Sequence, residues 1–131
     1  MDAVEALRRV SLFADLDNRQ LKKLAQRFHE RILNPGTSVV QEGTMSGVGF
    51  FVVAEGTAEV TVDGKQVQTV GPGDHFGELA MIAGKERAAT VTATTELHCF
   101  EIPFWDFREF AHDNPDVTWK LLEHVVNLLQ P

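Results

Sequence analysis

FGELAMIAGKERAATV, residues 76–91, is the stretch around which the rest of this chain of 131 residues is organised. It contains two glycines, four alanines and a single arginine, Arg87. The stretch has too many small residues for an ordinary core strand and too many apolar residues for an ordinary surface loop. Its composition suits a backbone that wraps closely around a small ligand. We therefore expect the rest of the chain to form a frame for this segment.

The composition predicts a single globular domain over residues 1–131, because 44% of the residues are hydrophobic and 24% are charged. We divide it into a helical part (1–29), a β-barrel (30–102) that includes 76–91, and C-terminal helices (103–131). The net charge of -7 disfavours binding to nucleic acid or to an acidic membrane surface. No leader opens the chain, and no window approaches the roughly 20 apolar residues of a membrane span. A cytoplasmic protein is expected.

Short apolar runs separated by turn residues predict a mainly β fold with flanking α-helices. The run Phe50–Ala54 is continuously apolar, which is typical of a strand buried on both faces. Asp63-Gly64 stands between two alternating runs and predicts a hairpin with a type I′ turn. The single cysteine, Cys99, excludes an internal disulfide and lies in an apolar run that predicts a buried thiol. Many short strands of near-regular spacing favour an antiparallel barrel or sandwich.

Helix signals flank the strands on both sides. Asp17 with Gln20 three residues later has the spacing of a capping box for an N-terminal helix. Asn114-Pro115 predicts the cap and first turn of a final helix that extends to about Gln130. Apolar residues of this final helix cover an arc of about 200°, twice what a minimal core-facing stripe needs. The spare side, Trp119, Leu122 and Val126, is covered by neighbouring elements, by a ligand beneath it or by a partner helix.

The side chains of residues 77–87 suit a ligand that carries a phosphate and a sugar. Arg87 offers a planar, permanently charged fork of donors to a phosphate. A short helical turn over 78–83 would aim free backbone N–H groups at the same anion, and Gly77 would let the ligand approach. The carboxylate of Glu78 is an acceptor for a sugar hydroxyl. Taken alone, Arg87 is a surface arginine, Glu78 a solvated acid and Gly77 a turn residue, so the hypothesis depends on their combination.

FGELA followed by a short loop and RAATV resembles the phosphate-binding cassette of cyclic nucleotide-binding domains. Regulatory subunits of cAMP-dependent kinases, gated channels and bacterial catabolite-activator-type regulators share this cassette. The resemblance extends over residues 12–129 and includes the Pro35-Gly36 turn and Gly56. It implies an antiparallel jelly-roll-like β-barrel (double-stranded β-helix), with N-terminal helices, two C-terminal helices and no catalytic activity.

The resemblance also implies roles for residues of the cassette. Glu78 would bind the ribose 2′-hydroxyl and Arg87 the cyclic phosphate. Cyclic GMP-selective members often have threonine after the arginine, whereas this chain has Ala88, so cAMP is favoured over cGMP. Further residues of the ligand site would be Phe76, Gly77, Leu79, Ala80, Ala88 and Ala89. The base would be covered from the final helix, with Trp119, Leu122 and Val126 as the possible lid.

Three functions follow from these patterns. The first is a non-catalytic cAMP sensor in which binding repositions the C-terminal helices, with a second copy or an output domain on the last helix. The second is a protein-interaction module that uses the same barrel without a ligand. The third is a cupin-type metal-dependent enzyme, which needs a close histidine pair and a carboxylate. No metal site is expected, because no HxH pair occurs among the five histidines, His29, His75, His98, His112 and His124.

Overall fold

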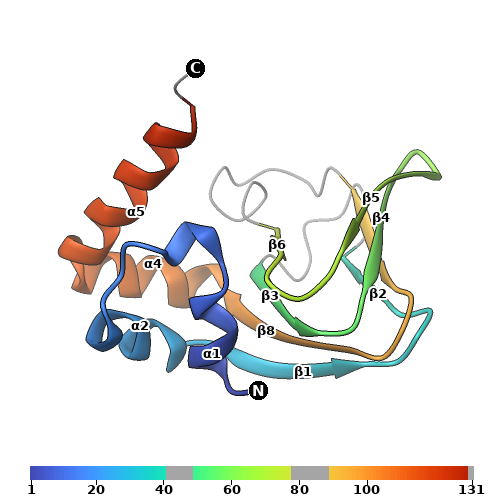
Figure 1. Cartoon of the computed structure of the whole chain (residues 1–131), viewed down its shortest axis with the longest axis horizontal. Coiled ribbons are helices and arrows are strands. Elements are labelled where there is room, and N and C mark those ends of the chain that lie inside the picture. The colour runs from blue at the N-terminus through green and yellow to red at the C-terminus, as the bar shows by residue number, and fades with distance from the viewer. Residues whose placement is uncertain (41–48, 78–88, 130–131) are drawn as a thin grey trace.

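The computed structural model describes residues 1–40, 49–77 and 89–129, and within these ranges the strands form two sheets (Figure 1). The strands are β1 (His29–Leu33), β2 (Ser38–Val40), β3 (Gly49–Glu55), β4 (Ala58–Val62), β5 (Lys65–Val70), β6 (His75–Phe76), β7 (Thr90–Ala93) and β8 (Leu97–Pro103). The helices are α1 (Ala3–Arg8), the 3-10 turn η1 (Ser11–Phe13), α2 (Asn18–Ala25), α4 (Phe104–Asp113) and α5 (Pro115–Leu128). The mainly β fold with flanking helices is thus confirmed.

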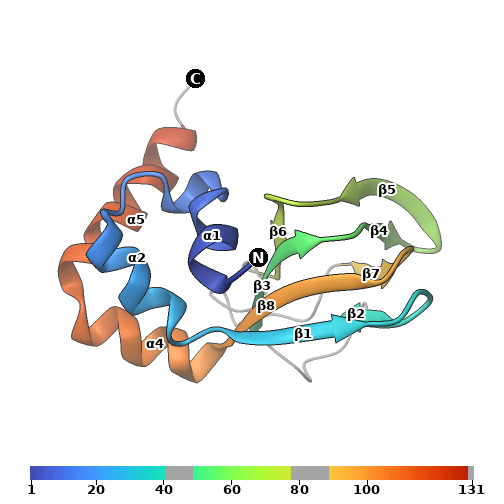
Figure 2. The ribbon, with the colours of Figure 1, turned by 60° about the horizontal axis from the view of Figure 1, so that its bottom comes forward.

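Each sheet has four antiparallel strands, in the orders β1-β8-β3-β6 and β2-β7-β4-β5. We expected a barrel; among the described residues the strands pair only within each sheet, so the jelly roll is two facing sheets without closure. The helices gather at one end of the sheets, as Figure 2 shows. Sequence neighbours such as β3 and β4 therefore lie in different sheets, and the chain crosses between them repeatedly.

Strand β3 is buried on both faces, as its unbroken apolar sequence predicts. Phe50, Val52 and Ala54 face the helices, whereas Phe51 and Val53 face the space between the sheets. This alternation follows from the two-residue period of a strand. Because both faces are covered, β3 joins two separate hydrophobic cores.

The first core lies between the helices and one face of β3 and β8. Phe50 is its centre, because the rings of Phe13 and Phe28 meet it edge-on, with centroids 6.0 and 6.2 Å away. Edge-to-face pairs of this kind are each worth about 0.5–1.5 kcal/mol beyond the buried area. The buried members are Ala6, Leu7, Val10, Phe13, Leu21, Leu24, Ala25, Phe28, Phe50, Val52, Ala54, Phe100, Ile102, Phe110 and Val117. Helices from both ends of the chain thus depend on the same strand.

The second core fills the space between the two sheets. Phe51 from β3 and Phe76 from β6 stack there with ring centroids 4.9 Å apart and planes 9° from parallel. The buried members are Val40, Phe51, Val53, Ala58, Val70, Phe76, Val91, Ala93, Leu97 and Cys99. Both sheets contribute, so the second core holds them together.

Two local signals are confirmed in atomic detail. Asp63 and Gly64 have φ values of 52° and 78°, and they connect Val62 to its partner Lys65, as a type I′ hairpin requires. At the start of α2, the Asp17 side chain accepts from the Gln20 N–H at 2.9 Å. The Gln20 side chain in turn accepts from the Asp17 N–H at 3.1 Å, which completes the capping box.

The start of α5 differs from expectation. Asn114 precedes Pro115 at the first helical position, but its side chain makes no capping hydrogen bond to α5. Its amide instead donates to the Phe110 carbonyl oxygen at 3.0 Å, which completes the end of α4. With φ at -131° and ψ at 67°, Asn114 is shared between two consecutive helices, and the carbonyls of α4 compete for its side chain. In the described ranges, no helix is both long and apolar enough to span a membrane.

Gly56, between β3 and β4, is expected to tolerate no side chain. Its φ is +86°, and an added Cβ would lie 2.1 Å from the Glu96 backbone oxygen. Gly56→Ala should therefore lower the free energy of unfolding by more than about 2 kcal/mol, measured by urea denaturation. Gly64→Ala is the matched control, because φ is +78° there but nothing lies within 4 Å of the added Cβ. It should cost only about 1 kcal/mol. Equal losses for the two variants would contradict the steric explanation.

Candidate ligand-binding site

The two ends of the 76–91 segment are held by different sheets. Phe76 belongs to β6, pairs with Phe51 of β3 and is 8% exposed. Gly77 follows with φ at +96°, a conformation that strongly favours glycine. At the other end, half-buried Ala89 precedes β7, whose Val91 lies in the core between the sheets. The chain between Gly77 and Ala89 therefore begins on one sheet and ends on the other, with both ends anchored in the second core.

The central residues of the predicted site lie outside the described residues. Phe76, Gly77 and Ala89 lie where the fold can be examined, and the structure places them at the two margins of the segment. The side chains assigned to the ribose and phosphate are not described, nor are three of those expected to line the pocket. These five are Glu78, Leu79, Ala80, Arg87 and Ala88.

A charged pair that the sequence analysis did not single out lies in the same sheet as Phe76. Glu101 of β8 is the cross-strand partner of Phe51, which in turn pairs with Phe76. Its Oε1 atom is 3.1 Å from Nη1 of Arg31 on β1, and its side chain is only 17% exposed. Directly paired residues share a face, so the ion pair lies on the face that carries the second core. The sequence does hold a signal, since Glu101 continues the period of buried Leu97 and Cys99.

The spare apolar side of α5 is exposed, so the described elements next to it do not cover it. Trp119, Leu122 and Val126 are 62%, 51% and 46% exposed. Helix α5 packs against η1 and α4, on the far side of α1 from both sheets (Figures 1 and 2). In this arrangement α5 lies apart from β6 and β7, which hold the described ends of the 76–91 segment.

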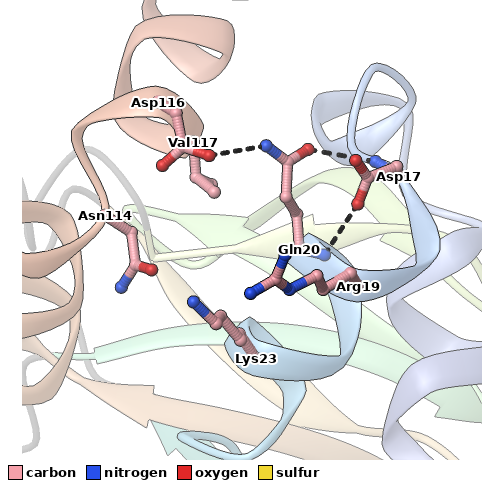
Figure 3. A pocket seen from close by; sticks show the side chains of 7 residues that line it. All are labelled: Asp17, Arg19, Gln20, Lys23, Asn114, Asp116 and Val117. Carbon is pink, nitrogen blue, oxygen red and sulfur yellow. Dashed lines mark hydrogen bonds between the residues drawn. The ribbon is translucent and has the colours of Figure 1, made fainter.

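A polar pocket of about 200 Å³ lies between α2 and the first turn of α5. Figure 3 shows its lining, Asp17, Arg19, Gln20, Lys23, Asn114, Asp116 and Val117. The pocket belongs to the helical layer, whereas Phe76 and Gly77 lie with the sheets. Of the predicted ligand-site residues that the structure describes, none lines it.

The cupin-type enzyme alternative needs histidine and acidic side chains gathered around one point. Over residues 1–40, 49–77 and 89–129, no group of three or more histidine, cysteine, aspartate or glutamate side chains is placed to hold a metal ion. His29 and His98 each approach one carboxylate, of Asp106 at 3.8 Å and of Glu30 at 3.1 Å. These are pairs between one histidine and one acid, and the cupin geometry of several ligands around one point is not found in that part of the chain.

Comparison with known proteins shows which family shares the sequence of the 76–91 segment. The family model described as "Cyclic nucleotide-binding domain" matches residues 30–114, which is more than half of the chain and includes the whole segment. This chain belongs to the cyclic nucleotide-binding domain family. Among curated relatives, a cAMP-dependent protein kinase regulatory subunit from Yarrowia lipolytica is 41% identical over 93 residues, which are 70% of this chain and 24% of that protein. The domain spans between 21% and 33% of the length of the curated relatives it matches.

Solved structures of the family share the architecture. The N-terminal domain of a transcriptional regulator from Streptomyces coelicolor A3(2) has a TM-score of 0.85 and 32% identity, covering 95% of this domain and 90% of that chain. The regulatory domain of Toxoplasma gondii PKA, crystallised with cAMP, has a TM-score of 0.73 and 31% identity, covering 82% of this domain and 42% of that chain. The domain therefore has the jelly-roll architecture of this family.

The thiol of Cys99 is expected to be unreactive in the native domain. Its side chain is fully buried between the sheets, and burial raises its pKa from 9.0 to about 11 despite the nearby Arg31 charge. At pH 8 only about one thiol in a thousand is then ionised, and that thiolate is shielded. A coloured disulfide reagent at pH 8 should release almost no product from the native protein and one equivalent after denaturation in guanidinium chloride. Rapid release from the native protein would contradict this.

Proposed function

We propose that this domain is a non-catalytic sensor that binds a cyclic nucleotide, cAMP in preference to cGMP. The observation that carries the proposal is the complete FGELA…RAATV sequence, which begins in β6 and ends in β7 in a chain of this family. Solved relatives support the choice of ligand, since two are described as bound to or crystallised with cAMP. The proposal assigns the ribose 2′-hydroxyl to Glu78 and the cyclic phosphate to Arg87.

The preference for cAMP follows from the side chain after the arginine. Ala88 has no hydroxyl with which to meet the amino group of guanine. A pocket without that hydrogen bond gives cGMP no compensation for the desolvation of its extra polar group. Binding of adenine is therefore favoured over binding of guanine.

We further propose that ligand binding repositions the C-terminal helices. Helix α5 lies beyond α1, away from the sheets, and exposes Trp119, Leu122 and Val126. Movement of this apolar helix face over the base of a bound nucleotide would remove apolar surface from water and so lower the free energy of the complex. A ligand that favours one helix arrangement shifts the population toward it, and this shift is the signal. The same face, when it is not over the ligand, is the contact surface for a second copy or for an output domain.

A ligand-free interaction module remains the second candidate. The observation in its favour is the continuous apolar surface of α5, to which Val125 and Leu129 also contribute with exposures of 42% and 80%. Such a module would use α5 without any help from the 76–91 segment. Nucleotide titration separates the two functions.

Calorimetric titration with cAMP and with cGMP tests the sensor function. The parent should bind cAMP with micromolar or tighter affinity and cGMP more weakly. Arg87→Ala should weaken cAMP binding by about tenfold or more, because a charge-assisted hydrogen bond contributes about 1.5–3 kcal/mol. Arg8→Ala, in the exposed last turn of α1, is the matched control and should leave the affinity unchanged. An absence of binding heat with either nucleotide in the parent would overturn the proposal.

Tryptophan fluorescence tests the movement of α5. Trp105 is 68% exposed and would add its own signal, so the measurement uses a Trp105→Phe background in which Trp119 is the single tryptophan. Saturating cAMP should shift the emission of Trp119 to shorter wavelength, because covering the ring removes it from water. Titration of the Arg87→Ala variant at the same cAMP concentrations is the control. An unchanged spectrum at saturation in the parent background would show that α5 does not serve as the lid.

A further inference from the structure

The side chain of Gln20 connects α2 to the start of α5. Its Nε2 atom donates to Oδ2 of Asp116 at 2.9 Å (Figure 3). Its Oε1 atom accepts from Nζ of Lys120, also at 2.9 Å. Residues nearly a hundred positions apart in the sequence are thereby joined through a single amide group.

Both residues of α5 that hydrogen-bond to the Gln20 side chain, Asp116 and Lys120, have ionisable side chains. The Gln20 hydrogen bond is the main cause that holds the pKa of Asp116 below its usual value, with a smaller contribution from the Lys23 charge. Asp116 therefore accepts as a carboxylate, and the contact from α5 to the other end of the Gln20 amide is donated by Nζ of Lys120. Hydrogen bonds with a charged partner are stronger than neutral ones, although exposure to water reduces that advantage.

The Gln20 side chain is also held within α2 itself, by a contact that does not involve α5. Its Oε1 atom also accepts from the Asp17 N–H, as the second half of the capping box. The capping box thus fixes the amide in the orientation that presents Nε2 to α5. A side chain ordered in advance loses less conformational entropy when it makes a further contact.

We propose that Gln20, Asp116 and Lys120 form a latch that holds α5 against the N-terminal helices and opposes its movement over the ligand. The inference rests on the proposed movement of α5 in nucleotide binding. In the latched arrangement both hydrogen bonds tie the N-terminal half of α5 to α2, so both must break before this end of the helix can move away from α2. The latch would set the population of the competent arrangement, and hence the apparent affinity for nucleotide.

Two variants each remove one hydrogen bond of the latch and leave the capping box intact. Asp116→Ala deletes the acceptor on α5, and Lys120→Met deletes the donor but keeps the length of the side chain. Gln20 itself is not substituted, since that would also remove half of the capping box of α2. Glu123→Gln, at an exposed position of α5 outside the latch, is the matched control for a charge change on this helix.

The first measurement needs no nucleotide. Spin labels on Lys22→Cys of α2 and Asn127→Cys of α5, both exposed positions, report the separation of the two helices by pulsed electron spectroscopy. The buried Cys99 should not take the label. We expect a broader distance distribution in both latch variants than in the parent and in Glu123→Gln. Identical distributions in all four proteins would overturn the latch, whether or not the domain binds a nucleotide.

The second measurement is cAMP affinity by calorimetry on the unlabelled full chain. Each latch variant should bind cAMP about two- to fivefold more tightly than the parent, because a partly exposed charged contact no longer opposes the movement. Broader distances with unchanged or weaker affinity would show that the contact does not oppose binding, which also overturns the inference. A parent that fails to bind cAMP contradicts the proposed function, and the distance measurement still decides whether the latch holds α5.

Discussion

The double burial of β3 is the constraint on which the rest of the structure depends. Phe50 on one face and Phe51 on the other are each 1% exposed. Burying a phenylalanine is worth roughly 1.5–3 kcal/mol, and here two consecutive residues contribute to different cores. The helical layer and the second sheet therefore cannot be placed independently, because both are packed on the same seven-residue strand.

The same strand holds the residue at which the 76–91 segment begins. Phe76, the residue from which the segment begins, is held by its stack on Phe51 and by its pairing with β3. The end of the segment is held by Val91 in the same core. Both ends of the segment are therefore anchored in the core between the sheets.

The helical layer shows how one residue can serve two levels of structure. Gln20 satisfies a backbone donor at the start of α2 and, with the remaining capacity of its amide, meets Asp116 and Lys120 of α5. The amide has two donor hydrogens and an acceptor oxygen with two lone pairs, so the contacts do not compete. Asn114 serves only one of its two helices in this way. Its side chain donates to a carbonyl at the end of α4 and makes no capping hydrogen bond to α5.

The sequence by itself determined the features that depend on a few neighbouring residues. These include the Asp63-Gly64 turn, the capping box at Asp17, the two-faced strand at Phe50–Ala54 and the family carried by residues 76–91. Local chemistry is sufficient for them, because turn geometry, capping and side-chain alternation act over a few positions. Only the tertiary structure decided what lies across from each element. The Arg31–Glu101 pair and the Gln20–Asp116 contact join segments 70 and 96 residues apart, and no period or motif in the sequence specifies such distant partners.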